Sequence, residues 1–170
     1  MTLRIMGAII ITIGCGCGGF LLAAAYRKEI KTLTSFIDML NFFECELQYR
    51  SPPLADIFGS YSATRNDTIS CFCSQLSQEL DAQICPNVQA CVLAALKKNS
   101  DIPSETANLL LKLGASLGKF SVDGQLLEIK SLRDEAQIKL EHLLSNQEAK
   151  TKNYKTLGLC AGAAIAILLI

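Results

Sequence analysis

An uncharged run of 21 residues, from Ile5 to Ala25, restricts the fold of this chain more than any other feature. As a helix rising about 1.5 Å per residue, it reaches across a bilayer hydrocarbon core of about 30 Å. A second uncharged run, residues 157–170, is 14 residues long. It can cross the bilayer if Tyr154 and Lys155 extend toward the surface, although a buried core helix would also fit that length. We therefore predict transmembrane helices at residues 1–25 and 156–170.

The first run also contains Gly14, Gly16 and Gly19, which match the G-x-G-x-x-G pattern of dinucleotide-binding folds. That fold needs a strand, a helix and then a second strand ending in an acidic residue about 20 positions later. Residues 27–50 have a helical period instead, so a cofactor enzyme built on this motif is the weaker interpretation. Small residues four positions apart let membrane helices approach closely. We assign four glycines to such packing: Gly14, Gly18, Gly158 and Gly162.

Basic residues beside the two runs predict which side of the membrane the central part faces. They follow the first run and precede the second, and only Arg4 lies on the far side: Arg27, Lys28, Lys31, Lys150, Lys152 and Lys155. Because short loops rich in Lys and Arg stay in the cytoplasm, we expect residues 26–155 to form a cytoplasmic domain. The five cysteines between the runs, an odd number, fit a reducing compartment. Removal of the first run as a signal peptide is the alternative, since Ala23–Ala25 resembles a cleavage site.

Between the two runs the apolar pattern predicts helices. The first helix continues to about Arg50 and ends at Pro52–Pro53, because a residue before proline avoids helical angles. We expect Ser51 to cap a short helix over residues 54–58. Asp67 and Asn87 are expected to cap helices over 69–80 and 88–98. The apolar stripe of the first helix is Tyr26, Ile30, Leu33, Ile37, Leu40, Phe43 and Leu47.

A further helix is expected over residues 104–118, closed by Gly118, and the last helix begins near Ser121. That last helix continues without a breaker into the C-terminal run. Two long helices then bracket the shorter ones and can pack antiparallel. The predicted fold class is an all-α helical bundle between N- and C-terminal transmembrane helices. The expected buried face of the last helix is Leu126, Ile129, Leu132, Ala136, Leu140 and Leu143.

The central domain contains few groups with obvious chemistry. His142 is the only histidine, and Cys71 and Cys73 lie two apart, which places them on different sides of a helix. Glu44 and Glu46 have the same spacing, so we expect one to touch a neighbour and the other to meet water. The domain has 15 basic and 16 acidic residues, which does not favour nucleic acid. We predict no catalytic residue, no metal site, no cofactor and no enzymatic activity.

Three segments of the chain resemble the stage III sporulation protein AB family of endospore-forming bacteria. Residues 44–49, ECELQY, running into Pro52–Pro53–Leu54, resemble its L-x-x-E-I-x-Y-x-x-T-P-L signature. Residues 113–129 resemble its F-G-x-x-L-G-x-x-D-x-x-Q segment, and residues 155–170 resemble its closing K-x-L-G-x-L-x-G span. From about residue 61 to 102 there is no shared motif.

The resemblance implies a bundle similar to the cytoplasmic domain of the type II secretion F protein. It also implies a non-enzymatic membrane platform for spore formation, coupling a secretion-type ATPase to the channel between mother cell and forespore. The expected location is the outer forespore membrane, on the mother-cell side. Expected partners are that ATPase, other stage III sporulation membrane and ring proteins, the lipid bilayer and a second copy of the chain. The alternative is a small membrane-anchored adaptor or regulator unrelated to secretion.

We expect the membrane-distal end of the domain to contact a partner. About 24 helical residues separate Ala25 from Tyr49, which places that end roughly 36 Å beyond the membrane. The antiparallel last helix would begin near the same height. The candidate contact residues are Glu44, Glu46, Tyr49, Arg50, Asp123 and Gln125. The alternative is that these side chains only cap and hydrogen-bond the turn.

Overall fold

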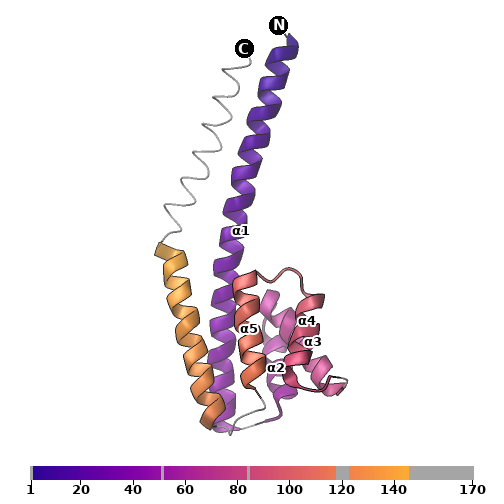
Figure 1. Cartoon of the computed structure of the whole chain (residues 1–170), viewed down its shortest axis with the longest axis vertical. Coiled ribbons are helices and arrows are strands. Elements are labelled where there is room, and N and C mark those ends of the chain that lie inside the picture. The colour runs from indigo at the N-terminus through magenta and orange to yellow at the C-terminus, as the bar shows by residue number, and fades with distance from the viewer. Residues whose placement is uncertain (1, 51, 84, 118–122, 146–170) are drawn as a thin grey trace. The chain divides into compact units, whose positions relative to one another are not determined.

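The computed structural model describes residues 2–50, 52–83, 85–117 and 123–145, with side chains described from residue 21 onward except residue 22. Within these ranges, every regular element is an α-helix (Figure 1). A sixth helix, over residues 123–145, follows the five that Figure 1 labels. The all-α prediction is therefore confirmed. The labelled helices are α1 (Thr2–Tyr49), α2 (Leu54–Thr64), α3 (Thr68–Asp81), α4 (Val88–Lys98) and α5 (Ser104–Ser116).

The chain divides into two compact units, residues 1–28 with 142–170, and residues 29–141. In the first unit the Tyr26 hydroxyl donates a hydrogen bond to the Leu143 carbonyl at 3.0 Å. The predicted spans 1–25 and 156–170 belong to this unit and lie almost entirely outside the residues with described side chains. Among the side chains that are described, no helix offers a stretch long and apolar enough for a membrane crossing.

In the second unit, the core is built around the latter part of α1. The predicted stripe is confirmed there, because Leu33, Ile37, Leu40, Phe43 and Leu47 are all buried. Phe36 and Met39, which lie outside that stripe, are also fully buried. The helix buries a wider face than a single stripe because α2, α3 and the 123–145 helix all contact it. The contacts are the ring pair Phe43–Phe58 at 4.5 Å, Met39 with Cys73 of α3, and Glu44 with Arg133 of the last helix.

The helix starts follow local capping chemistry in two of three predicted cases. The Asp67 carboxylate accepts a hydrogen bond from the Ser70 N–H, and the Ser70 hydroxyl oxygen accepts one from the Asp67 N–H. Together the two bonds form a capping box at the start of α3. Asn87 caps α4 by accepting from the Ala90 N–H at 2.8 Å. The predicted Ser51 cap is wrong: Pro53 occupies the N-cap of α2 without a side-chain bond, and Ser51 lies outside the described residues. A proline is tolerated at a helix start because an N–H there would have no partner within the helix, and because its φ is already fixed near the helical value.

Two helix lengths also differ from the predictions. α2 continues to Thr64 instead of stopping near residue 58, because Tyr61 is buried against α1 and extends the apolar face by another turn. α5 ends at Ser116, and the residues expected to close it and to start the next helix, Gly118 and Ser121, lie outside the described residues. These differences leave the order of the helices as predicted.

The close packing of α4 against α5 depends on a glycine. A Cβ atom at Gly114 would lie 2.8 Å from Cγ2 of Val92, closer than real Cβ contacts allow. A glycine in mid-helix costs about 1 kcal/mol relative to alanine, so the missing side chain has a packing reason here. The contact fixes the height at which the two helices cross.

The 123–145 helix packs along α1 and α5. Its predicted face is confirmed: Ile129, Leu132 and Ala136 are buried, and Leu126, Leu140 and Leu143 are half-buried. Ion pairs flank this face on the α5 side, joining Lys112 to Glu135 at 2.8 Å and Lys139 to Glu105 at 3.0 Å. Figure 1 shows the helix in orange running antiparallel to α1.

Candidate partner-contact surface

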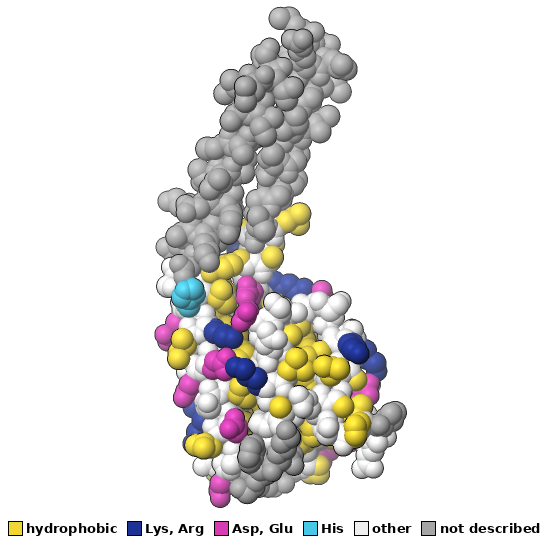
Figure 2. Space-filling model, viewed as in Figure 1, with side chains coloured by type: hydrophobic (Ala, Val, Ile, Leu, Met, Phe, Trp, Pro, Cys, Tyr) yellow, Lys and Arg dark blue, Asp and Glu magenta, His cyan; other side chains and the backbone are white. Residues whose placement is uncertain are grey.

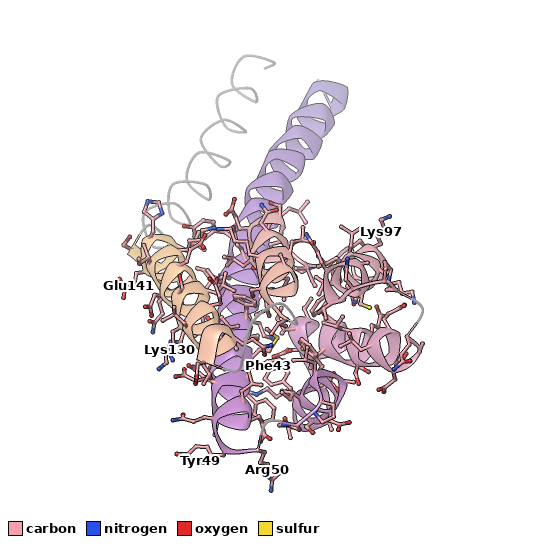
Figure 3. The ribbon with its side chains drawn as sticks, turned by 60° about the horizontal axis from the view of Figure 1, so that its bottom comes forward. Phe43, Tyr49, Arg50, Lys97, Lys130 and Glu141 are labelled. Carbon is pink, nitrogen blue, oxygen red and sulfur yellow. The ribbon has the colours of Figure 1, made fainter. Side chains whose placement is uncertain are left out.

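The end of α1 presents an aromatic ring and a cation to solvent. Tyr49 is 79% exposed and Arg50 is exposed, while Phe43 two turns earlier is fully buried. Figure 3 shows Tyr49 and Arg50 projecting away from the bundle and Phe43 pointing into it. The Arg50 N–H donates to the Glu46 carbonyl at 3.0 Å, so the helical geometry is kept to the last turn. Tyr and Arg are the residue types that most often dominate protein interfaces.

Glu44 and Glu46 have different roles, as their spacing predicts. Glu44 is only 19% exposed and forms ion pairs with Arg133 and Lys130 of the last helix. Arg133 also donates to the Asn41 side chain at 3.4 Å. Glu46 is half-buried, and no ion pair within the described part of the chain involves it. Glu44 therefore holds two helices together, and only Glu46 of the two remains available to a partner.

The Glu44–Arg133 pair also sets the register of the two antiparallel helices. Because both rise about 1.5 Å per residue, Tyr49 lies near the height of residue 128, and residues 123–125 lie about one turn farther along. Asp123 is exposed, and Gln125 is half-buried with a polar contact of its own. The structure thus brings the six predicted residues to one end of the second unit, with the last helix starting slightly beyond the end of α1.

Leu127 is a surface residue that sequence reasoning missed. Its side chain is 71% exposed, although it lies next to the half-buried Leu126 and two positions from the buried Ile129. The available signal was its position off the predicted apolar stripe of its own helix. By the same register it lies near the height of Tyr49. This large, exposed apolar side chain adds a hydrophobic group to the candidate contact surface.

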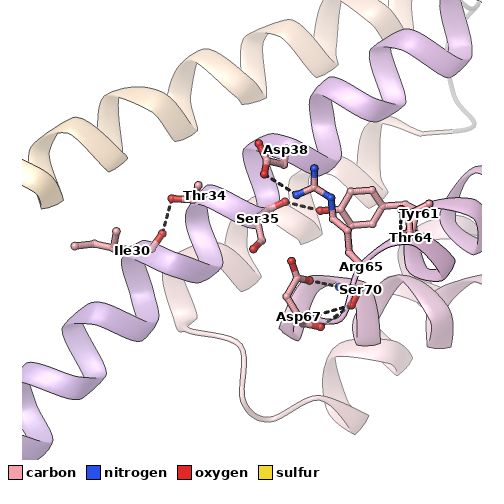
Figure 4. Close-up of polar contacts among 9 residues, drawn as sticks. All are labelled: Ile30, Thr34, Ser35, Asp38, Tyr61, Thr64, Arg65, Asp67 and Ser70. Atoms are coloured by element: carbon pink, nitrogen blue, oxygen red, sulfur yellow. Dashed lines mark hydrogen bonds and ion pairs between the residues drawn. The ribbon is translucent and has the colours of Figure 1, made fainter.

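A polar cluster anchors α2 to α1 at residues 35–38, several turns before the end of α1 (Figure 4). The Tyr61 hydroxyl donates to the Ser35 carbonyl at 3.0 Å, and Arg65 pairs with Asp38 at 2.7 Å. The Arg65 guanidinium also lies 5.5 Å from the centre of the Tyr61 ring. Burial raises the pKa of Tyr61 well above its usual value, with Asp67 adding to the effect, so the phenol stays neutral and acts as a donor. This cluster positions the helices and was not predicted.

The cysteines singled out from the sequence lie on different sides of α3. Cys71 is exposed, whereas Cys73 is buried with its Sγ 3.4 Å from Sδ of Met39. Burial raises the pKa of Cys73, so its thiol stays protonated inside the core. In the described residues, no three His, Cys, Asp or Glu side chains are grouped to hold a metal ion. The glycines assigned to membrane packing, Gly14, Gly18, Gly158 and Gly162, have no described side-chain environment.

The surface of the second unit carries mixed charge. Figure 2 shows acidic and basic side chains interspersed on the face in view, with an apolar area between them. The half-exposed Leu93 of α4 belongs to the exposed apolar residues of this unit. Interspersed charge does not create the single-sign field that attracts a polyanion, so the surface fits protein contacts better.

The family model described as "Stage III sporulation protein AB" matches residues 4–170. A solved structure of a stage III sporulation protein AB superposes with a TM-score of 0.65 at 18% identity, covering 72% of this chain and 98% of that one. At that identity the likeness concerns the fold. A search of curated proteins gives no match.

Proposed function

The chain belongs to the stage III sporulation protein AB family, and we propose that it serves spore formation as a non-enzymatic membrane platform coupling a secretion-type ATPase to the channel between mother cell and forespore. The observation that carries this proposal is the extent of the family match. It includes both terminal apolar runs and the whole helical bundle between them. The proposed function is therefore assigned to the whole chain, including both apolar runs and the helical bundle.

In this proposal the two runs anchor the chain in the outer forespore membrane, and residues 26–155 face the mother-cell cytoplasm. The antiparallel packing of α1 and the 123–145 helix supports a hairpin anchor. Because Glu44 pairs with Arg133, the chain enters and leaves the second unit at the same end, near residues 29 and 141. Both connections can then lead to one membrane. The bundle would be similar to the cytoplasmic domain of the type II secretion F protein.

The anchoring is tested by labelling a single thiol. Cys71 is exposed on α3, so a version of the full chain that keeps Cys71 and replaces the other seven cysteines reports where the bundle lies. In cells that produce the chain without sporulating, so that it inserts in the plasma membrane, we expect a membrane-impermeant maleimide to label Cys71 only after the cells are opened. Strong labelling from outside intact cells would reverse the proposed orientation.

The proposed ATPase contact is the end of α1 with the start of the last helix. Among the predicted contact residues, the side chains of Glu46, Tyr49, Arg50 and Asp123 form no hydrogen bond or ion pair with another described residue. Tyr49 is 79% exposed, so its ring contributes little to the packing of the bundle. Burial of this ring against a partner would favour binding.

Co-purification with the ATPase after mild solubilisation tests the contact. We expect the double variant Glu46→Ala/Tyr49→Ala to keep its melting temperature but no longer to capture the ATPase. Cells that carry this variant should form far fewer heat-resistant spores. The matched control is Leu93→Ala/Lys97→Ala on α4, which also removes one exposed apolar and one charged side chain. Undiminished capture by a folded Glu46→Ala/Tyr49→Ala variant would overturn this contact, and absence of any ATPase in wild-type preparations would favour an unrelated adaptor.

A further inference from the structure

The last helix, residues 123–145, has two large apolar side chains on the side that faces away from the bundle. Leu127 is 71% exposed and Ile138 is 69% exposed. They are eleven positions apart, which is about three helical turns, so they point in nearly the same direction and lie about 16 Å apart along the axis. Ala136, fully buried, comes nine positions after Leu127 and therefore lies on the opposite side of the helix. The two apolar side chains form one line directed away from the core.

Exposed carboxylates accompany this line. Asp134 lies four positions before Ile138 and Glu141 lies three positions after it, so both are its neighbours on the helix surface. Asp134 has one distant contact, 3.9 Å from Arg133, and Glu141 pairs with no residue of the described part of the chain. Figure 3 shows Glu141 projecting away from the bundle. The cations of this helix are engaged instead with carboxylates of α1 and α5: Lys130, Arg133 and Lys139.

The spacing of the exposed residues suits contact with another helix. We define the outer face as Leu127, Ser131, Asp134, Ile138 and Glu141, which follow one another at steps of four, three, four and three positions. Side chains at these steps form a seam along which a second helix can pack. In this seam the two apolar residues can act as anchors, and the small Ser131 between them lets a partner approach closely. The outer face therefore has the form of a helix-binding surface.

We propose that the outer face is a docking site for a cationic amphipathic helix of another protein. Apolar residues of that helix cover Leu127 and Ile138, and its Lys or Arg side chains pair with Asp134 and Glu141. This site is separate from the proposed ATPase contact, because Ile138 lies about 15 Å along the axis from the height of Tyr49.

The charges on the outer face argue against other occupants. Two chains anchored in one membrane, as proposed above, would bring their last helices together in parallel. Asp134 would then face Asp134 and Glu141 would face Glu141, and such like-charge contacts oppose association. The same two carboxylates repel nucleic acid and anionic lipid. A helix that carries cations is instead attracted by both carboxylates, and this attraction weakens as salt screens it.

Peptide binding to the full chain tests the proposal directly. The chain is placed in phosphatidylcholine nanodiscs, with empty nanodiscs as the blank. The probe is a fluorescent, alanine-based helical peptide with two leucines eleven positions apart and arginines three or four positions from each leucine on the same face. The control peptide has glutamate in place of each arginine. We expect fluorescence anisotropy to show binding of the arginine peptide alone, and the binding should weaken several-fold between about 0.05 M and about 0.5 M salt.

Variants of exposed residues locate the binding. Ile138→Gln and the double variant Asp134→Asn/Glu141→Gln should each weaken binding of the arginine peptide by about tenfold or more, without a change in melting temperature. Glu128→Gln is the matched control, because Glu128 is an exposed carboxylate of the same helix about 100° around the axis from Leu127. It should bind the peptide as the wild type does. Equal binding of the two peptides, or undiminished binding by the folded double variant, would contradict the proposal.

A photo-crosslinking residue in place of Ile138 identifies the partner in sporulating cells. We expect the crosslinked segment to belong to another protein and to carry Lys or Arg at helical spacing, and the crosslink should be lost with Asp134→Asn/Glu141→Gln. Crosslinking to a second copy, to a segment without such cations, or to no protein at all would overturn the proposal. The variant Glu46→Ala/Tyr49→Ala should keep this crosslink, so failure of the proposed ATPase contact and failure of this site are distinguishable.

Discussion

Removing the carboxylate of Glu44 should loosen the last helix from α1. The Glu44 and Arg133 side chains are 19% and 27% exposed, so they have given up most of their water. The substitution Glu44→Gln keeps the shape but removes the counter-charge of Lys130 and leaves Arg133 with only the exposed Asp134, 3.9 Å away. A hydrogen bond to a charged group contributes about 1.5–3 kcal/mol, and the remaining solvent access favours the lower half of that range, about 2 kcal/mol.

That loss converts to a measurable shift in melting temperature. The second unit spans residues 29–141. With an unfolding entropy of about 2.1 cal/mol/K per residue, a unit of this size shifts by about 4 °C per kcal/mol, so Glu44→Gln should melt about 8 °C lower. Thermal unfolding of the full chain in mild detergent, followed by far-UV circular dichroism, measures it. The control Asp38→Asn breaks a pair whose members are 45% and 41% exposed, and it should cost less than about 1 kcal/mol.

A double-mutant cycle isolates the pair. Arg133→Met keeps most of the apolar stem and removes the charge, so the double variant with Glu44→Gln should be more stable than the sum of the two single losses implies. We expect a coupling of about 1–2 kcal/mol, the size typical of contacting charged groups. The reasoning is refuted if the coupling is near zero, or if Glu44→Gln melts no lower than the Asp38→Asn control.

Three further substitutions test other parts of the bundle. Tyr61→Phe removes a buried donor but leaves the Ser35 carbonyl with its helical partner inside α1, so we expect a loss of about 1 kcal/mol in urea unfolding. Gly114→Ala should destabilise by about 1–3 kcal/mol despite the better helix propensity of alanine, and Val92→Ala in the same chain should recover part of that loss; a stabilised Gly114→Ala would contradict the packing. The Lys112 hydrogen bond lowers the pKa of Glu135, so its contribution to stability is present above the ordinary glutamate pKa and is lost as pH falls through the lowered value. Lys112→Met should therefore cost under about 1 kcal/mol at neutral pH, and pH-dependent melting curves of the variant and the wild type should converge in acid.

Helix order and the two buried stripes could be predicted because both follow from local rules. Leu33 to Leu47 on α1 and Ile129 to Ala136 on the last helix repeat every three or four residues, and a helix with that period has one apolar face. Asp67 and Asn87 were readable as caps for the same reason: each satisfies N–H groups within its own next turn. Such features need no knowledge of where the rest of the chain lies.

The contacts that hold the helices together were not readable from the sequence. Arg133 lies 89 positions from Glu44, and Tyr61 lies 26 positions from Ser35, so no local pattern pairs them. The burial of Phe36 and Met39 likewise depends on how many other helices pack against α1. The spacing of apolar residues in α1 does not predict that number. The Ser51 cap failed because a proline two positions later can begin a helix without any side-chain bond.

The two segments that resemble family motifs within the bundle owe their residues to different physical causes. In the segment 113–129, Gly114 lies under Val92 and Ile129 is fully buried, so packing accounts for both. In the segment 44–54, Glu44 is accounted for by its ion pair with the last helix. Packing does not account for Tyr49, whose ring is held in water at the end of α1. Tyr49 is therefore the residue of this segment at which a substitution tests the proposed partner contact most directly.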